Sequence, residues 1–558
     1  MAITEFSSGP ERRQVGFVGD MPADAVEALK RRGHEPYQLR TSDLSQRFFL
    51  GRTCAVVLTQ QVESPKGIYR ELEAFAGALN HDCRIYVRWA PDGQAKEALL
   101  RSLNKLKLPP SGYNRREAKF FYGDWIDHDL PFVYAPFVHL VDPNASWDEF
   151  ANTIVHNEAG PAPYDSLKIE ASDTAGKPID IGDEADLLIR RAFHNCERVC
   201  LFGKGNGLSG VGAYEGYAYL RDGELGGTWP YKFFVKLGGR VKVAREFYKY
   251  GTTLLENVPF HLGPRLRRER CVLGATHGLI VSDFVLGAET ICESAREGRG
   301  VSAIANLFNV TLLPWRRAAK ETPLPLGDYL LKEILSNEKG QPRAVPDHRA
   351  ERLQAFGASA TIADLLQVVR DMLPSTPVLT GMVHGDLHAT NVLVRGNDAV
   401  VIDLERVSTD APLLFDAANL EAGLFVDGFI KDRRSAKDIL ASLAPLYEVE
   451  AFEKDDHHCD PSNPSAWFMD SIRQIRMQAK QMECVKLQYA WMLGAVFVKK
   501  ACNPDDFAAG VEGAHFVTFD EMPSNWMTAR EAIRTLTYIV GERILLGLSS
   551  RESTGAPT

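Results

Sequence analysis

The segment 384–405 constrains the fold of this chain more than any other stretch of its sequence. It begins with the polar loop HGDLHATN and continues with two short apolar runs, 392–395 and 399–402, joined by a Gly-Asn-Asp turn. Apolar runs of this length around a glycine-containing turn predict a β-hairpin. A hairpin returns the chain to its starting point, so we expect Asp403 to lie beside Asn391 at the end of the polar loop.

The polar loop carries the residue types that phosphoryl transfer requires. Transfer from a nucleotide needs an acidic group beside the attacking hydroxyl and oxygen ligands that hold Mg²⁺ against the phosphates. In the spacing H-x-D-x-x-x-x-N, Asp386 is placed to accept the hydroxyl proton, whereas Asn391 and Asp403 are placed to bind the metal. The alternative is a chance loop of common turn residues, which leaves the fixed offsets, the two apolar strands and the following acid unexplained.

The loop and the acid after the hairpin resemble those of the aminoglycoside phosphotransferase and choline kinase branch of the protein-kinase-like superfamily. That branch has H-G-D-x-x-x-x-N loops and an I-D-x-E segment, which correspond here to residues 384–391 and 402–405. Eukaryotic protein kinases instead have Arg after the His and Asp-Phe-Gly at the metal-binding position. The resemblance implies a two-lobed fold with a β-rich small lobe and a mainly helical large lobe. It also implies ATP or GTP as donor, Mg²⁺, and a hydroxyl acceptor in a small molecule or protein.

The same resemblance gives supporting roles to two further residues. The His of kinase-like loops usually braces the backbone, so His384 is expected to support the loop without taking part in the chemistry. The segment Leu-Leu-Phe-Asp-Ala-Ala at 413–418 is similar to one whose Asp anchors the catalytic loop. Asp416 therefore receives a structural role.

A nucleotide-binding half is expected upstream of the loop. Residues 198–202 and 214–220 are typical of two strands around the glycine-rich stretch 203–212. Backbone approaches phosphate closely only where side chains are absent, which such a stretch supplies. A plain glycine-rich turn is the alternative. The predicted nucleotide contacts in this stretch are Gly207, Leu208, Ser209 and Gly210.

The strand that follows ends in a lysine after an apolar run. Strands of this kind carry the lysine that pairs with the α- and β-phosphates. Lys236 is therefore the predicted phosphate-pairing residue, and Glu246, on a helix predicted over 241–252, is its predicted ion-pair partner. A different alignment of this region would nominate Lys232 or Lys242 instead.

A further apolar strand, 278–285, runs into a polar connection and is typical of the hinge between the lobes. A hinge binds the adenine through backbone groups, so its side chains give no specific signal. The residues predicted to contact the nucleotide here are Ser282, Asp283 and Phe284.

The first 156 residues alternate between strand-like and helix-like segments, a pattern that predicts a doubly wound parallel α/β sheet. This domain resembles a TIR-type or a receiver-type domain. In catalytic TIR domains a glutamate on the helix after such a strand cleaves NAD, which nominates Glu71. The chain lacks the opening Ser-Tyr-x-x-x-Asp pattern of that family, and Thr59 stands where a receiver has its phospho-accepting Asp. A sensory or protein-docking domain without chemistry is the favoured interpretation.

Composition limits the partners and the location of the chain. A net charge of −9 and a pI near 5.9 argue against nucleic acid as the main partner, because a phosphate-binding face usually carries a basic excess. No run approaches the roughly 18 apolar residues of a membrane span. The nine cysteines are scattered, which suits reduced thiols. We therefore expect a cytoplasmic protein without a membrane contact.

A chain of 558 residues is too long for one core, so several domains are expected. Residues 157–183 are rich in Pro and Gly and are predicted to be a linker. The expected order is an α/β domain over 1–156, the linker, a kinase-like small lobe over 184–281, and a helical large lobe over 282–558.

Two classes of function remain open, besides NAD cleavage by the first domain. One is an ATP-dependent phosphotransferase with an N-terminal sensory or docking domain. The other is a pseudokinase that binds nucleotide as a signalling or defence scaffold. The first is favoured because degenerate kinases often lose one of the catalytic positions, and all of them are present here. These positions are Lys236, Glu246, Asp386, Asn391 and Asp403.

Overall fold

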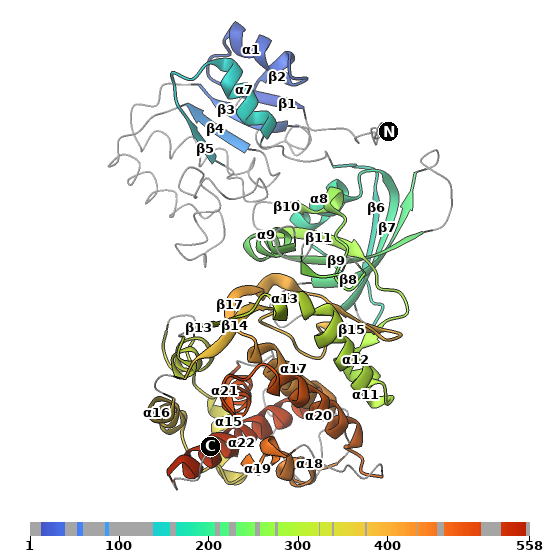
Figure 1. Ribbon diagram of the computed structural model, residues 1–558. Helices are drawn as coiled ribbons and strands as arrows, with labels where there is room; N and C mark the ends of the chain where they lie inside the picture. The colour runs from blue at the N-terminus through green and yellow to red at the C-terminus, as the bar shows by residue number, and fades with distance from the viewer. Residues whose placement is uncertain are drawn as a thin grey trace. The chain divides into compact units, whose positions relative to one another are not determined.

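The structure is a computed structural model, and it divides the chain into two compact units (Figure 1). The first unit contains residues 1–251 and 265–284, and the second contains 252–264 and 285–558. The structure describes residues 13–39, 53–59, 84–88, 138–156, 163–173, 175–206, 212–221, 230–250, 257–259, 261–273, 277–322, 324–337, 340–373, 376–430, 432, 434–454, 462–503 and 526–553. Among these residues, no helix is long and apolar enough to cross a membrane.

Five parallel strands form the first sheet of the first unit, in the order β2-β1-β3-β4-β5. This is a strand order of doubly wound α/β domains. All six residues of β3 are buried, because a central parallel strand is covered on both faces. The elements are β1 (Gln14–Val18), α1 (Ala23–Lys30), β2 (Glu35–Gln38), β3 (Thr53–Leu58), β4 (Arg84–Arg88), β5 (Val138–Val141) and α7 (Trp147–His156).

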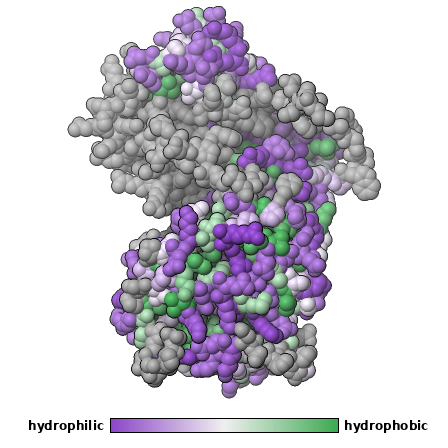
Figure 2. Space-filling model, viewed as in Figure 1, coloured by the Kyte–Doolittle hydropathy of each residue, from purple (hydrophilic) through white to green (hydrophobic). Residues whose placement is uncertain are grey.

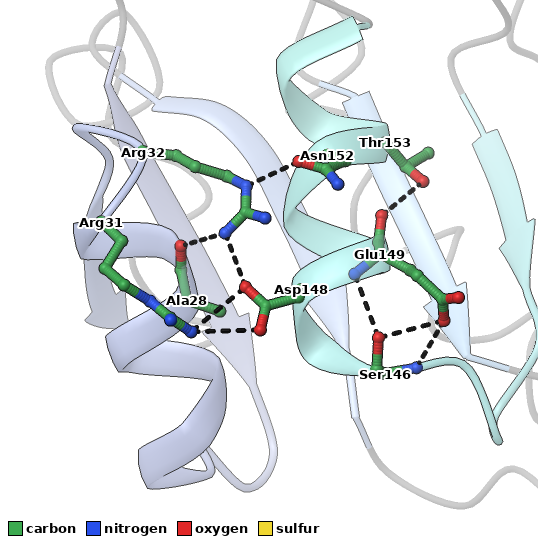
Figure 3. A network of polar contacts seen from close by, with 8 residues as sticks. All are labelled: Ala28, Arg31, Arg32, Ser146, Asp148, Glu149, Asn152 and Thr153. Atoms are coloured by element: carbon green, nitrogen blue, oxygen red, sulfur yellow. Dashed lines mark hydrogen bonds and ion pairs between the residues drawn. The ribbon is translucent and has the colours of Figure 1, made fainter.

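Helices α1 and α7 lie against each other, and Figure 3 shows the polar contacts between them. Arg31 and Arg32, which follow α1, both reach the Asp148 carboxylate of α7, at 3.1 and 2.8 Å. Exposed ion pairs of this kind contribute little to stability. The larger contribution comes from the apolar side of α7, where the buried rings of Phe150 and Tyr86 pack edge to face with centroids 5.5 Å apart.

Two residues considered for chemistry in this domain have different outcomes. Glu71, the nominee for NAD cleavage, lies outside the described residues. Thr59 follows β3, and its hydroxyl donates to the carbonyl oxygens of Val18 and Asp20, at 3.1 and 2.5 Å. The side chain at this position therefore joins the ends of β1 and β3.

Six strands form the second sheet of the first unit, in the order β10-β11-β9-β8-β7-β6. Neighbouring strands are antiparallel, except that β6 and β7 are parallel. One face of the sheet buries Phe233 and Val235 against Leu188 and Phe193. The elements are β6 (Lys168–Ser172), α8 (Asp183–Ala192), β7 (Cys196–Asn206), β8 (Gly212–Leu220), β9 (Tyr231–Gly239), α9 (Arg240–Lys249), η4 (Arg268–Arg270), β10 (Val272–Leu273) and β11 (His277–Asp283).

Strand β6 corrects the expectation that 157–183 is only a linker. Its residues pair with Arg198–Phe202 of β7, and Leu167 just before it is buried in the same core. The strand is the last of the sheet order and reads KIEAS, with charged residues at alternate positions. The sequence of this edge strand has almost no apolar pattern from which a strand could be predicted, so pairing with β7 decides its structure.

The second unit is mainly helical, with two small sheets in the orders β12-β15-β16 and β13-β14-β17. The strands are β12 (Glu289–Thr290), β13 (Lys320–Thr322), β14 (Val378–Val383), β15 (Val392–Arg395), β16 (Asp398–Val401) and β17 (Ser408–Pro412). The α-helices are α11 (Ile291–Arg296), α12 (Gly300–Asn306), α13 (Leu313–Arg317), α14 (Leu326–Tyr329), α15 (Asp347–Ala355), α16 (Ile362–Met372), α17 (Leu414–Phe429), α18 (Ala436–Leu443), α19 (Val449–Glu453), α20 (Ala466–Lys480), α21 (Gln488–Cys502) and α22 (Trp526–Ser553). Shorter 3₁₀ or π-helical turns are η5 (Leu307–Thr311), η6 (Leu330–Ile334), η7 (Leu404–Arg406) and η8 (Ala444–Tyr447).

Helix α17 lies at the centre of the second unit, where it packs on α20, α21 and α22. It is buried along almost its whole length, and its buried residues include Asp416 and Glu421 besides the apolar ones. Two ion pairs are buried among these helices: Arg476 with Glu421 at 2.7 Å, and Arg349 with Glu531 at 2.5 Å. Each buried guanidinium therefore has a carboxylate partner, which offsets the cost of removing both charges from water.

The segment 252–264 joins the second unit although both its flanks belong to the first. Leu262 is fully buried, and its carbonyl oxygen accepts the N–H of Val401, at the end of β16, at 3.1 Å. This contact ties the short segment to the strand that leads into Asp403.

Figure 2 shows that the described surface is mostly hydrophilic on the face drawn. Large apolar side chains that are exposed, such as Leu286 and Phe202, are scattered along the chain. Isolated apolar residues of this kind are normal on globular proteins. They give no reason to place a partner on the surface that the structure describes.

Candidate active site

The loop 384–391 follows β14 and is held in shape by its own hydrogen bonds. The backbone carbonyl of Asp386 accepts the N–H of His388 at 2.9 Å, and the carbonyl of His388 accepts the N–H of Asn391 at 2.9 Å. The Asn391 side chain also donates its Nδ2 to the Asp386 carbonyl at 2.9 Å. Because the amide nitrogen is bound inside the loop, the Oδ1 oxygen of Asn391 is the atom left to hold a cation.

Asp416 binds the start of the loop from α17. Its carboxylate accepts the backbone N–H of His384 at 2.7 Å and that of Gly385 at 3.0 Å. Burial raises the pKa of Asp416, while the nearby His384 and the two N–H donors oppose that change. Two buried backbone donors thus depend on one carboxylate, which fixes the first turn of the loop.

Two glycines allow the loop to pack this closely. Gly385 has φ +77°, and a Cβ there would lie 2.3 Å from the carbonyl oxygen of Arg406. A Cβ on Gly423 of α17 would lie 2.8 Å from the Cβ of His388 and 2.9 Å from the backbone nitrogen of Ala389. A real Cβ atom does not approach backbone or other carbon atoms this closely, so both positions require glycine.

The hairpin after the loop has the predicted form. Strands β15 and β16 pair antiparallel from Val392 opposite Val401 to Arg395 opposite Asp398, one residue closer to the turn than expected. Gly396, with φ +64°, occupies the first position of the two-residue turn, where type II′ turns favour glycine. The prediction of a hairpin over these residues is confirmed.

The hairpin brings the two predicted metal ligands together along the backbone. The N–H of Ile402 donates to the carbonyl oxygen of Asn391 at 3.0 Å, and Asp403 is the next residue. His384 contacts the same place, because its Nε2 lies 2.8 Å from the Ile402 carbonyl oxygen and donates to it. Asp403 itself has left-handed backbone angles, φ 61° and ψ 72°. Left-handed geometry in a residue other than glycine costs about 1–2 kcal/mol and is often found at functional sites.

The residues present fit Mg²⁺, which is bound in phosphotransferases by one or two protein carboxylates together with phosphate oxygens. Asn391 and Asp403 supply one amide oxygen and one carboxylate. Within the described part of the chain, no group of three or more His, Cys, Asp or Glu side chains gathers as a metal site.

Asp386 is ionised by the charges around it. Burial raises its pKa, but Lys500, His388, Arg406 and His384 lower it by more, so the pKa lies below its ordinary value. Its side chain is 38% exposed, and the nearest His388 nitrogen lies 3.8 Å from its carboxylate. The loop thus presents a charged carboxylate that is accessible to a small molecule.

Helix α21 adds two lysines near this carboxylate that the sequence analysis did not select. Lys500 acts electrostatically on Asp386, and the Lys499 ammonium lies 4.9 Å from the ring centre of Phe415. Phe415 directly precedes Asp416. The available signal was a Lys-Lys pair at the end of an apolar helix, a pattern usually explained by the helix dipole.

The first unit holds the predicted phosphate-pairing lysine. The Nζ of Lys236, in β9, lies 2.7 Å from Oε2 of Glu246, in α9, and both side chains are largely buried. Lys232, two pleats earlier on the same face of the strand, instead binds Glu215 at 2.6 Å and lies over the ring of Phe284 at 3.9 Å. The structure thus pairs Lys236 with Glu246, as the sequence predicts.

Some polar groups of the predicted hinge residues already form hydrogen bonds within the protein. The N–H of Asp283 donates to Arg265 at 2.8 Å, and Ser282 lies in β11 opposite Phe234 of β9. The Asp283 carboxylate accepts the Tyr231 hydroxyl at 2.7 Å. Ser282 and Asp283 thus belong to β11, and Phe284 is the residue that follows the strand.

The glycine-rich stretch 203–212 begins in β7, which continues to Asn206, and ends at Gly212, the first residue of β8 and the partner of Asn206. The four predicted contacts in it lie outside the described residues. They are Gly207, Leu208, Ser209 and Gly210.

Comparison with known proteins gives three results. A family model described as "Ternary complex associated domain 9" matches residues 341–490, which include the catalytic loop. A search of curated proteins gives no match. Solved structures that match include a glucosamine kinase in complex with glucosamine, ADP and inorganic phosphate, which is 15% identical with a TM-score of 0.29 over 57% of this chain and 80% of that one.

Two other matching structures are phosphotransferases as well. One is a thermostable mutant of aminoglycoside phosphotransferase APH(4)-Ia in its apo form, 13% identical, with a TM-score of 0.26 over 54% of this chain and 93% of that one. The other is choline kinase LicA from Streptococcus pneumoniae, 15% identical, with a TM-score of 0.24 over 54% of this chain and 92% of that one. These proteins are of the class that the sequence motifs resemble. At such TM-scores the roles of individual residues depend on the geometry of this chain alone.

Proposed function

We propose that the chain is a phosphotransferase that moves the γ-phosphoryl group of ATP or GTP to a hydroxyl acceptor. The observation that supports this proposal is a pair of hydrogen bonds: the Asn391 side chain donates to the Asp386 carbonyl oxygen, and the Asn391 carbonyl oxygen accepts the N–H of Ile402, the residue before Asp403. Phosphoryl transfer depends on positioning and on charge stabilisation, and a loop held by backbone hydrogen bonds supplies fixed positions.

Each of these residues has a defined part in the proposed reaction. The acceptor oxygen forms a bond to the γ-phosphorus, the bond from that phosphorus to the departing nucleoside diphosphate breaks, and the hydroxyl proton passes to the Asp386 carboxylate. Asn391 Oδ1 and the Asp403 carboxylate would hold Mg²⁺, which neutralises charge on the phosphates when bound. Lys236, kept in place by Glu246, would pair with the α- and β-phosphates.

For the N-terminal sheet we propose a sensory or docking role. Its Thr59 hydroxyl is engaged with the backbone of Val18 and Asp20, an arrangement that joins strand ends and provides no phospho-accepting acid. A parallel sheet with buried strands is also a rigid platform on which loops can bind a partner.

The first experiment compares the wild type with Asp403→Asn in a thermal-shift assay with ATP, GTP and NAD, with and without Mg²⁺. We expect a Mg²⁺-dependent shift with ATP or GTP that Asp403→Asn removes, because the variant loses a charged metal ligand. A wild-type response with NAD alone, or full Mg²⁺-dependent binding and turnover in Asp403→Asn, would refute the assignment.

A further inference from the structure

Two half-buried lysines near the catalytic loop differ from the other buried cations of the second unit. Arg349 and Arg476 each have a carboxylate partner within 2.7 Å. Lys499 and Lys500 form no ion pair with any residue that the structure describes. The fold therefore neutralises its structural cations and leaves these two ammonium groups without such a partner.

The charges around the two lysines are mostly positive. Asp386 is the carboxylate that acts on both, and Asp427, which also acts on Lys500, has an ion pair of its own with Arg530 at 3.6 Å. The cations that act on one or the other lysine are Arg343, Arg406, Arg530 and Arg534, in addition to the lysines themselves. Both lysines thus lie among other cations, and Asp386 is a carboxylate that acts on both of them.

Such an arrangement is costly in the absence of a ligand. Burial opposes the charged form of an ammonium group, and like charges nearby oppose it further. Both effects act on Lys499 and lower its pKa to about 7. Functional sites often hold groups in such unfavourable surroundings, because a ligand of opposite charge can then bind them strongly.

The position of the lysines connects this charge to the acceptor. Lys499 lies over Phe415, whose neighbour Asp416 holds the start of the catalytic loop, and Lys500 acts directly on the Asp386 carboxylate. The two lysines therefore lie near the start of the loop, and Lys500 is close enough to Asp386 to act on its charge. The Asp386 carboxylate would repel the charged group of a bound anion. Such an acceptor would therefore have to turn its hydroxyl, and not its charged group, toward Asp386.

We propose that the acceptor is an anionic hydroxyl compound, whose phosphate or carboxylate group binds Lys499 and Lys500 while its hydroxyl lies at Asp386. This inference rests on the proposed function, because it defines the acceptor class of the same site. Lysine is a flexible point charge and suits either anion. A cationic acceptor would meet two ammonium groups of its own sign.

The first test measures binding without turnover. Calorimetric titrations of the full chain compare glycerol with glycerol 3-phosphate and glycerate, which share a carbon skeleton and differ in charge, and add choline as a cationic probe. We expect at least one of the two anions to bind at least tenfold more tightly than glycerol and choline. Comparison of glycerol 3-phosphate with glycerate shows whether the site prefers a phosphate or a carboxylate. Equal or tighter binding of glycerol or choline overturns the inference.

Variants locate the binding. Lys499→Gln and Lys500→Gln are each expected to weaken anion binding at least tenfold, and Lys500→Arg is expected to restore most of it. Lys437→Gln, at an exposed position of α18, is the matched control and should bind like the wild type. Thermal unfolding of each variant shows whether it is folded. Anion binding that survives both glutamine variants but is lost in Lys236→Met belongs to the donor half and overturns the inference.

Turnover separates this inference from the proposed function. With Mg²⁺ and ATP, the anionic acceptors should give ADP at a kcat/KM at least tenfold above their neutral parents, and Lys499→Gln should raise the KM of the acceptor more than that of ATP. Faster turnover of a neutral or cationic acceptor refutes the anionic class but leaves the phosphotransferase intact. Anion binding that depends on the lysines, in a chain that neither binds nor consumes ATP, supports the anion site and refutes the phosphotransferase.

Discussion

The two units hold their functional side chains in different ways. In the first unit, Lys236 forms a side-chain ion pair with Glu246, and the two partners come from a strand and a helix. In the second unit, the catalytic loop depends on backbone groups bound by Asp416, His384 and Asn391. An ion pair between separate elements is lost when the helix moves, whereas a loop tied to its own backbone keeps its shape.

This difference indicates which half can be regulated. A lysine whose position depends on a helix can be switched by moving that helix, and control of such a pair is a known route to kinase regulation. The catalytic loop, in contrast, is preorganised, which favours a constant geometry around the reacting groups. Variants in the first unit and variants in the second unit should therefore differ in which property they change, and not only in the size of the change.

The largest effect is expected for Asp386→Asn. The variant keeps the shape of the side chain but removes the charge that accepts the hydroxyl proton, so kcat should fall by about 10²–10⁴-fold with little change in ATP affinity. Asp398→Asn is a matched control, because its side chain is also 38% exposed and lies in the adjoining hairpin. Steady-state kinetics and nucleotide titration of both variants measure this. An unchanged kcat in Asp386→Asn would show that another residue accepts the proton.

A smaller effect is expected for Lys236→Met, with a fall in kcat/KM for ATP of about 10²-fold from the loss of a charge on the phosphates. Lys232→Met, on the same strand and face, should stay within about threefold of the wild type if Lys232 serves only Glu215. Glu246→Gln should fall between them, because glutamine can still accept a hydrogen bond from Lys236. If Lys232→Met has the larger effect, the phosphate-pairing lysine has been placed wrongly.

For Asp416→Ala the main change should be in stability. The N–H groups of His384 and Gly385 would lose their acceptor in a buried place, at a cost of about 1–3 kcal/mol. Chemical denaturation against Asp410→Ala, an exposed residue of β17, measures the difference. The kcat should fall as well, whereas ATP affinity should change little. A large loss of ATP affinity would show that the two halves are less independent than the geometry indicates.

The smallest effect is expected from pH. The pKa of Lys499 is lowered to about 7 by burial, Lys500, Arg343 and Arg406, with Asp386 opposing them. Its ammonium is therefore complete below pH 7 and is lost as the pH rises above it. The KM for a carboxylate acceptor should rise by about tenfold between pH 6 and pH 8, and this rise should disappear in Lys499→Gln. A KM that is flat over this range in the wild type would separate Lys499 from the acceptor.

Local sequence was sufficient for the catalytic hairpin. The two short apolar runs and the Gly-Asn turn are features of neighbouring residues, and they specify β15, β16 and the return to Asn391 without reference to the rest of the chain. Lys236 and Glu246 were also accessible, because a strand that ends in lysine and an acid on the next helix are separated by only a short stretch of chain.

Features set by distant contacts could not be predicted in this way. Strand β6 has a polar sequence and becomes a strand only by pairing with β7. The hydrogen bond from the Asp283 N–H to the Arg265 carbonyl oxygen joins two separate parts of the chain, and no local pattern indicates it. The two lysines of α21 have the pattern of an ordinary helix C-terminus. Only the fold shows that Lys500 acts on Asp386, which is more than a hundred positions earlier in the sequence.

The insertion of Leu262 beneath β16 has a consequence for how the chain is made. Residues 252–264 leave the ribosome long before Val401, so Leu262 remains without its final partner while more than a hundred further residues are synthesised. The second unit therefore cannot finish folding at the time when its first segment, residues 252–264, is synthesised. Fragments that begin at residue 285 lack this segment, and a cut there would leave the Val401 N–H without its acceptor immediately before Asp403. A separately produced catalytic unit would have to keep residues 252–264, supplied either by the intact chain or as a peptide.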